Sequence, residues 1–147
     1  MAAKIEDIGA CVFDAYGTLF DVNAAAAQCR DALGGKADEL SALWRTRQLE
    51  YPWLRSLMQE YVEFWQVTGD GLDYALAVLG IEDDALRQRL MDIYMRLDAY
   101  PEVKDVLTAL KVGGLKTAIL SNGSPKMLSS AVENAGINEV LDDTFSV

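Results

Sequence analysis

Short apolar runs alternate with amphipathic stretches along this chain, and the alternation predicts strands and helices in turn. Residues 8–13 are apolar and lead into Asp14 and a glycine turn, which is typical of a buried parallel strand and its following loop. Residues 115–120 give a second buried strand, and residues 145–147 give the beginning of a third. The pattern therefore predicts a parallel sheet whose first two strands lie far apart in the sequence.

The apolar residues between the first two strands follow a helical period throughout. Asn23 is a candidate N-cap for a helix over 24–33, with Gly34 just past its end. Further helices are expected over 38–51, over 52–67 with Pro52 in the first turn, over 72–79 after a turn at 68–71, and over 83–97. Helices over 102–112 and 126–135 flank the second strand, the latter beginning at Ser124-Pro125 and ending at Gly136.

The order strand, helical insert, helix, strand, helix, strand predicts an α/β fold with a doubly wound, Rossmann-like parallel core and an inserted helical subdomain. The core comprises residues 1–21 and 98–147, and the helical insert comprises residues 22–97. Open sheets average about five to six strands. We therefore expect the core to be incomplete here and to continue beyond Val147.

Composition narrows the classes of function. The net charge is −10, and an anionic surface argues against nucleic acid or a membrane as the main partner. Histidine is absent, which excludes Ser-His and Cys-His catalysis and most zinc chemistry. The first nine residues include acidic groups and no long apolar run, so no signal peptide is expected. With two cysteines in apolar contexts and no membrane-spanning run, we expect a cytoplasmic protein.

Two polar clusters follow the predicted strands, at residues 14–18 and 121–124. Ligands of doubly wound sheets bind outside the carboxyl ends of the strands, so these clusters are the candidate site. A carboxylate at the end of a buried strand needs partners, and the N–H groups of the Gly17 turn and the Thr18 hydroxyl are the expected donors to Asp14. Held in this way, Asp14 would stay ionised and act as a nucleophile. The alternative is an aspartate that only caps the turn.

The same residues resemble a known superfamily. Residues 13–21, FDAYGTLFD, resemble the first motif of the haloacid dehalogenase superfamily, and residues 120–123, LSNG, resemble its second. The helical stretch between them matches the inserted cap of that superfamily. Within this stretch the segments LWR (43–45), QLEY (48–51) and WLRSLM (53–58) resemble the L-2-haloacid dehalogenases, the type II branch. The resemblance covers essentially the whole chain.

The resemblance implies roles for the residues of the two motifs. Asp14 is the nucleophile, and Thr18 belongs to the catalytic group around it. Ser121 holds the substrate carboxylate, and Asn122 helps to cradle the halide. Ser124, in contrast, is interpreted only as a helix N-cap.

Three cap residues also receive roles by resemblance, and each has a structural alternative. Arg45 receives the departing halide, whereas most helix arginines merely face solvent. Leu49 and Phe64 wall the pocket beside the alkyl group of the substrate, or else pack in the core. Arg47 and Arg55 are interpreted as surface residues.

Tyr16 separates the dehalogenases from the phosphatases of the superfamily. The phosphatases carry a second aspartate at this position, which protonates a leaving alkoxide. A halide ion needs no proton, so a tyrosine removes only the acid that phosphoryl transfer requires. Tyr16 therefore favours the dehalogenase, whether it contacts the substrate or is simply a core aromatic.

The implied reaction converts a short L-2-haloalkanoic acid into a D-2-hydroxyalkanoic acid and a halide ion through an aspartyl ester, without metal or cofactor. A homodimer is also implied. The lysine and the later Ser, Asn and Asp residues that serve the second step have no match up to Val147, so we expect the chain as given to be impaired. A magnesium-dependent phosphatase and a non-catalytic dimerising module are the alternatives.

Overall fold

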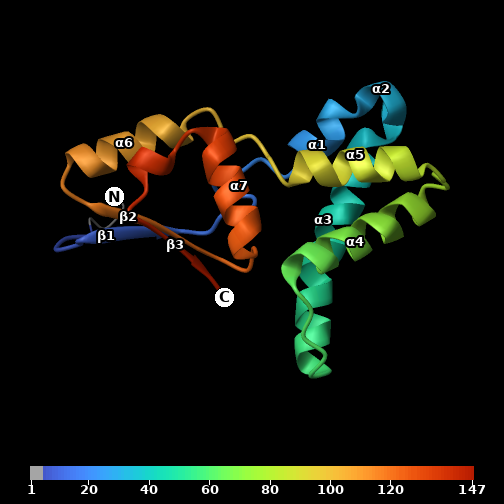
Figure 1. The fold of residues 1–147 in the computed structure, drawn as a ribbon, viewed down its shortest axis with the longest axis horizontal. Coiled ribbons are helices and arrows are strands. Elements are labelled where there is room, and N and C mark those ends of the chain that lie inside the picture. The colour runs from blue at the N-terminus through green and yellow to red at the C-terminus, as the bar shows by residue number, and fades with distance from the viewer. Residues whose placement is uncertain (1–4) are drawn as a thin grey trace.

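A parallel sheet lies beside a block of helices in the computed structural model of this protein (Figure 1). The structure describes residues 5–147, and the first four residues of the predicted core segment 1–21 lie outside it. The three strands follow the order β1-β2-β3 and are parallel, which confirms the predicted α/β class. The strands are β1 (Ala10–Phe13), β2 (Lys116–Ser121) and β3 (Asp143–Ser146).

Helices α6 (Val103–Val112) and α7 (Pro125–Ala135) lie over one face of the sheet (Figure 1). On that face β2 buries Thr117, Ile119 and Ser121. The opposite face leaves apolar side chains exposed, among them Val12, Leu120 and Phe145. The prediction of fully buried strands is therefore wrong for this structure, because within residues 5–147 a helical layer covers one face of the sheet.

The chain between β1 and α6 is all-helical, as predicted. Its elements are α1 (Ala24–Gln28), α2 (Arg30–Leu33), the 3-10 turn η1 (Gly34–Lys36), α3 (Ala37–Leu57), α4 (Phe64–Val78) and α5 (Asp84–Tyr94). A second 3-10 turn, η2 (Asn138–Val140), precedes β3. No helix within residues 5–147 is both long enough and apolar enough to cross a membrane.

Helix α3 runs through Pro52, so the predicted boundary between two helices at this proline is wrong. A proline inside a helix removes one N–H donor and crowds the preceding turn, at a cost of about 3 kcal/mol. The contacts of α3 with α4, the most extensive between any two elements described, offset that cost. The helix ends instead near Gln59, whose backbone is left-handed with φ 60°.

The predicted turn at residues 68–71 is also wrong, because these residues lie inside α4. The two glycines that suggested a turn serve close helix packing instead. A Cβ atom on Gly71 would lie 3.3 Å from the Gln48 backbone nitrogen and 3.4 Å from the Trp44 carbonyl oxygen on α3. Gly71 thus lets α4 approach the backbone of α3, a requirement that local sequence does not reveal.

The predicted helix over 24–33 is broken at Cys29 into α1 and α2. Asn23 precedes α1 but its side chain does not cap it. The Asn23 side-chain oxygen instead accepts a hydrogen bond of 2.6 Å from the Ser41 hydroxyl on α3. A tertiary contact has therefore replaced the predicted local one.

Other helix ends follow the predicted local chemistry. The Asp83 carboxylate accepts a hydrogen bond from the Leu86 N–H at the start of α5, which ends at Tyr94 rather than at 97. The Ser124 hydroxyl accepts from the Met127 N–H at the start of α7, and Gly136 ends that helix in the left-handed conformation. These caps use side chains within a few residues of the helix end, which is why the sequence predicts them.

Two connections join the sheet to the helical block, and they lie side by side. The Asp21 N–H donates to the Asp98 carbonyl at 2.9 Å, and the Tyr100 N–H donates to the Leu19 carbonyl at 3.0 Å. The predicted division into residues 1–21 with 98–147 and residues 22–97 falls at these paired connections. As a division into subdomains it stays a prediction.

Asp142 joins α6, β2 and the segment before β3. Its carboxylate accepts from the Lys111 ammonium at 2.9 Å and from the Thr117 N–H at 2.8 Å. The Lys111 hydrogen bond, with that of the Thr117 N–H, lowers the pKa of Asp142 from 3.8 to about 2. A carboxyl group whose pKa is depressed on folding stabilises the fold above its unfolded pKa, and this contribution is lost as the pH falls through the folded value.

We therefore expect Asp142→Asn to lower the Tm most above about pH 4, with the gap to the wild type closing between about pH 4 and pH 2. Thermal melts across this range measure the effect. Glu139→Gln, a substitution of an exposed carboxylate nearby, serves as the control. A gap that stays constant down to about pH 2 would show that Asp142 does not titrate as its contacts require.

Candidate active site

The two predicted polar clusters meet at one edge of the sheet. Strands β1 and β2 are parallel neighbours, and Phe13 pairs with Ile119. The loops that follow these strands, beginning at Asp14 and Asn122, therefore leave the sheet side by side. The prediction that adjacent strand ends bring the two clusters together is confirmed.

Asp14 lies at the end of β1 with its side chain exposed. The Gly17 N–H, a donor predicted for its carboxylate, donates instead to the Phe20 carbonyl, and among residues 5–147 the Thr18 hydroxyl makes no hydrogen bond to Asp14. Thr18 itself is exposed. The predicted hydrogen bonds to Asp14 are therefore wrong, because the turn satisfies its own backbone and the carboxylate, open to solvent, needs no buried partner.

The turn after Asp14 is tight and is built on a single carbonyl. The Ala15 carbonyl oxygen accepts from the N–H groups of Thr18, Leu19 and Phe20 at 2.9–3.3 Å. Gly17 sits in the left-handed region at φ 89°, and a Cβ atom there would lie 3.0 Å from the Arg45 Nη2 atom. Glycine at position 17 thus serves both the turn and the approach of Arg45 from helix α3.

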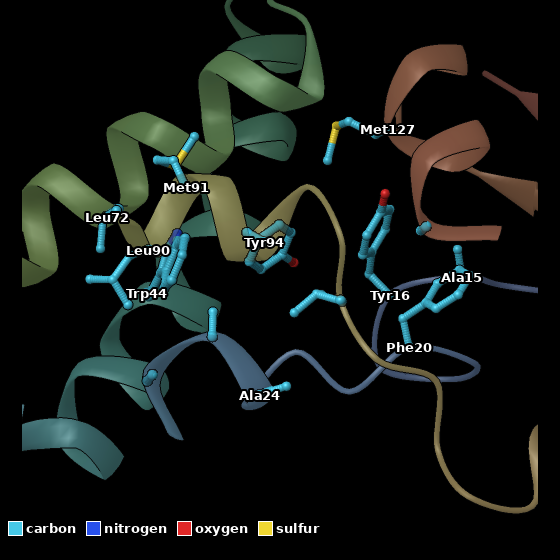
Figure 2. Close-up of a cluster of buried hydrophobic side chains, with 14 of the residues drawn as sticks. Ala15, Tyr16, Phe20, Ala24, Trp44, Leu72, Leu90, Met91, Tyr94 and Met127 are labelled. Atoms are coloured by element: carbon cyan, nitrogen blue, oxygen red, sulfur yellow. The ribbon is translucent and has the colours of Figure 1, made fainter. Parts of the chain in front are cut away.

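Tyr16 is a core aromatic, 3% exposed. Its ring lies 5.7 Å from that of Tyr94, 5.8 Å from that of Phe64 and 6.0 Å from that of Phe20. Figure 2 shows Tyr16 between Phe20 of the turn and Tyr94 of the helical block. Burial raises the pKa of the Tyr16 hydroxyl, so the group is neutral. The ring also explains the glycine of the second motif, since a Cβ atom on Gly123 would lie 2.7 Å from the Tyr16 ring.

Arg45 reaches from α3 to the turn after Asp14 and is half-buried. Its Nη2 donates to the Tyr16 carbonyl at 2.8 Å, and its Nη1 donates to the Gln48 side-chain oxygen at 2.8 Å. The alternative interpretation of Arg45 as an ordinary surface arginine does not fit these contacts. A guanidinium fixed beside the loop that follows Asp14 is a cation that can bind an anion there.

Gln48, Thr68 and Tyr94 form a buried polar network behind Arg45 that the sequence analysis did not identify. Gln48 Nε2 lies 2.9 Å from the Thr68 hydroxyl and 2.8 Å from the Tyr94 hydroxyl. Burial raises the pKa of Tyr94 to about 12, so this hydroxyl is also neutral. A signal was available: Leu40, Trp44 and Gln48 share one buried face of α3, and a glutamine is unusual on such a face.

The structure brings three of the remaining predicted residues to the site edge of the sheet and leaves Leu49 apart from them. Phe64 and Asn122 line a common cavity of about 180 Å³ between the helical block and the end of the sheet. Ser121 is buried, and its hydroxyl accepts from the Gly123 N–H at 3.1 Å. Leu49 is exposed and does not line this cavity, so the structure does not bring it to the others.

The two arginines interpreted as surface residues differ from each other. Arg47 pairs with Glu50 and lies over the Tyr74 ring, away from the site. Arg55 pairs with Asp70 at 2.6 Å and also lines the cavity that holds Phe64 and Asn122. The surface interpretation is therefore wrong for Arg55, which is only partly exposed.

The protein is thus of the α/β class, with Asp14 at the end of β1 and the Arg45 cation reaching the loop that follows it from the helical block. The family described as haloacid dehalogenase-like hydrolase matches residues 8–147. The chain belongs to this family.

Several known dehalogenases are similar to the chain in sequence and in structure. It is 51% identical over 144 residues to (S)-2-haloacid dehalogenase 1 of Pseudomonas sp. (strain CBS-3), covering 97% of this chain and 63% of the relative. A crystal structure of a dehalogenase superposes with a TM-score of 0.94 at 46% identity, covering 97% of this chain and 64% of that one. The L-2-haloacid dehalogenase of Xanthobacter autotrophicus, solved with chloropropionic acid covalently bound, gives a TM-score of 0.86 at 44% identity, with 96% and 57% covered. The chain thus spans less than two thirds of the length of these relatives.

Proposed function

We propose that this chain carries the halide-displacing site of an L-2-haloacid dehalogenase that acts on short L-2-haloalkanoic acids. The observation that supports the proposal most is Arg45, held by the Tyr16 carbonyl and Gln48 over the loop that follows Asp14. Relatives named as (S)-2-haloacid dehalogenases, among them one 51% identical, support the same reaction.

In the proposed first step a carboxylate oxygen of Asp14 attacks C2 of the substrate in line with the carbon–halogen bond. The new C–O bond gives an ester, and the halide leaves with the electron pair of the broken bond. The Arg45 guanidinium binds the departing halide. Its positive charge offsets the repulsion that an anion would feel from a chain of net charge −10. Asn122 completes the halide site, and Phe64, which lines the same cavity as Asn122, walls the pocket beside the alkyl group of the substrate.

In the proposed second step water attacks the carbonyl carbon of the Asp14 ester. The water oxygen stays on the Asp14 carboxylate, and the D-2-hydroxy acid leaves with the original aspartate oxygen. C2 is inverted once, in the first step. Ser121 binds the substrate carboxylate, and Tyr16 walls the site. The roles of Thr18 beside Asp14 and of Leu49 in the alkyl pocket stay predictions, because both residues are exposed.

The phosphatase alternative requires a carboxylic acid where Tyr16 stands. That position is filled by a buried ring that contacts three other aromatic residues, and its hydroxyl has a raised pKa. A weak acid fixed in a hydrophobic cluster is a poor donor to a leaving alkoxide. No observation therefore favours phosphoryl transfer over dehalogenation.

Intact mass and chloride release test the proposal together. Incubating the chain with L-2-chloropropionate should release chloride and add the mass of the substrate less hydrogen chloride. If turnover follows, oxygen-18 from water should enter Asp14 before it enters the product. Release of phosphate from a phosphate ester with Mg²⁺ would support the phosphatase instead, and a folded chain that releases neither ion would support the non-catalytic module.

The homodimer and the cytoplasmic location stay predictions. An apolar patch at the end of α3 is where a second copy would pack, and sedimentation of the chain tests this. The exposed side chains of the patch are Trp53, Leu54, Leu57, Met58 and Tyr61.

A further inference from the structure

A buried glutamine supports the guanidinium that is proposed to receive the halide. We infer that Gln48 is a positioning residue, which fixes Arg45 over the loop of the nucleophile without neutralising its charge. The inference rests on the proposed function, because that function gives Arg45 its task. Gln48 lies one helical turn after Arg45 on α3 and is 1% exposed.

Hydrogen-bonding capacity fixes the orientation of the Gln48 amide. Arg45 offers only donors, and its Nη1 lies 2.8 Å from one end of the amide, so that end is the carbonyl oxygen. The NH₂ end then donates to the Thr68 hydroxyl, and the Tyr94 hydroxyl lies 2.8 Å from the nitrogen and 3.0 Å from the oxygen of the amide. A flipped amide would set N–H groups against the N–H groups of Arg45 in a buried place, which is strongly unfavourable.

The network continues from Gln48 to the wall of the cavity. The Thr68 hydroxyl accepts from Gln48 and donates its own hydrogen to the Phe64 carbonyl at 2.7 Å. Phe64 lines the cavity with Asn122. One chain of hydrogen bonds therefore joins the Arg45 cation to the backbone of Phe64, the residue proposed to wall the substrate pocket.

A neutral amide suits this task better than a carboxylate. Glutamate at position 48 could accept from Arg45 equally well, but it would form an ion pair and cancel the charge that attracts the halide. It would also offer no donor to Thr68, whose hydrogen is already committed to Phe64. The amide orients the cation and leaves its charge available.

Bromide titration of the whole 147-residue chain tests the inference, followed through the Nε–H resonance of Arg45 in ¹H–¹⁵N spectra. We expect Gln48→Met, which keeps the length of the side chain, to weaken bromide binding about tenfold and to broaden or shift that resonance. Gln48→Glu should weaken binding at least as much. Gln66→Met, at an exposed glutamine on α4, is the matched control and should change neither quantity.

The outcomes separate this inference from the function on which it rests. A wild-type chain that binds no bromide, or an Arg45→Ala variant that binds it equally well, would overturn the proposed role of Arg45. Binding that needs Arg45 but is unchanged in Gln48→Met would overturn the role of Gln48 alone.

A further test uses the wild-type chain alone, so it does not depend on whether a variant folds. The side-chain NH₂ protons of Gln48 should exchange with water at least about tenfold more slowly than those of Gln66, because both are hydrogen-bonded in the interior. Equal exchange rates would overturn the network. A lowered Tm in Gln48→Met with an unchanged Arg45 resonance would likewise show a structural role only, and would overturn the inference.

Discussion

Replacing Asp14 by asparagine is expected to abolish ester formation from L-2-chloropropionate, lowering its rate by a factor on the order of 10⁴ to 10⁶. The carboxamide oxygen carries no negative charge and is a far weaker nucleophile than a carboxylate. The fold should survive, because the side chain is exposed and lies outside the hydrogen-bonded turn that follows it. The free energy of unfolding should therefore change by no more than about 0.5 kcal/mol.

Intact mass after a timed incubation measures this effect, and two controls make it specific. Asp21→Asn alters another carboxylate of the same motif, whose oxygen accepts from the Asn23 N–H, and should keep the adduct. Mild alkali should remove the adduct, since an ester is cleaved whereas a thioether on Cys11 or Cys29 is not. An alkali-labile adduct formed by the Asp14→Asn variant at the wild-type rate would contradict the assignment.

The second large effect is expected from Tyr16→Asp, the change that would supply the acid a phosphatase uses. We expect it to lower the free energy of unfolding by about 3–5 kcal/mol rather than to create phosphatase activity. The substitution removes a ring packed against Phe64 and against Phe20 and Tyr94, the latter two shown in Figure 2. It leaves a carboxylate in the same hydrophobic cluster. Tyr16 thus belongs to the hydrophobic core as well as to the candidate site.

Urea unfolding followed by circular dichroism measures this loss. Tyr16→Phe keeps the ring and should stay within about 1 kcal/mol of the wild type. A Tyr16→Asp variant as stable as Tyr16→Phe would contradict the view that the ring is a structural element of the core. Phosphate release by a folded Tyr16→Asp variant would contradict the view that this position cannot be converted by one substitution.

The candidate site could be predicted in part, and the limits are physical. Asp14 and Asn122 follow strand ends, and parallel pairing of β1 with β2 is sufficient to place the two loops together. The exposure of Asp14 could not be predicted, because it depends on which backbone groups of the turn satisfy one another. Gln48 was overlooked because its role depends on α4 and α5, which supply Thr68 and Tyr94.

By itself the sequence determined what depends on short-range chemistry: the α/β class, the caps at Asp83 and Ser124, and the carboxylate after the first strand. Only the tertiary structure decided that α3 continues through Pro52 and that Gly71 lies inside a helix. The reason is that a proline or glycine weakens a helix by only about 1 to 3 kcal/mol. The burial of one long helix against another can outweigh that cost, and no local pattern reports it.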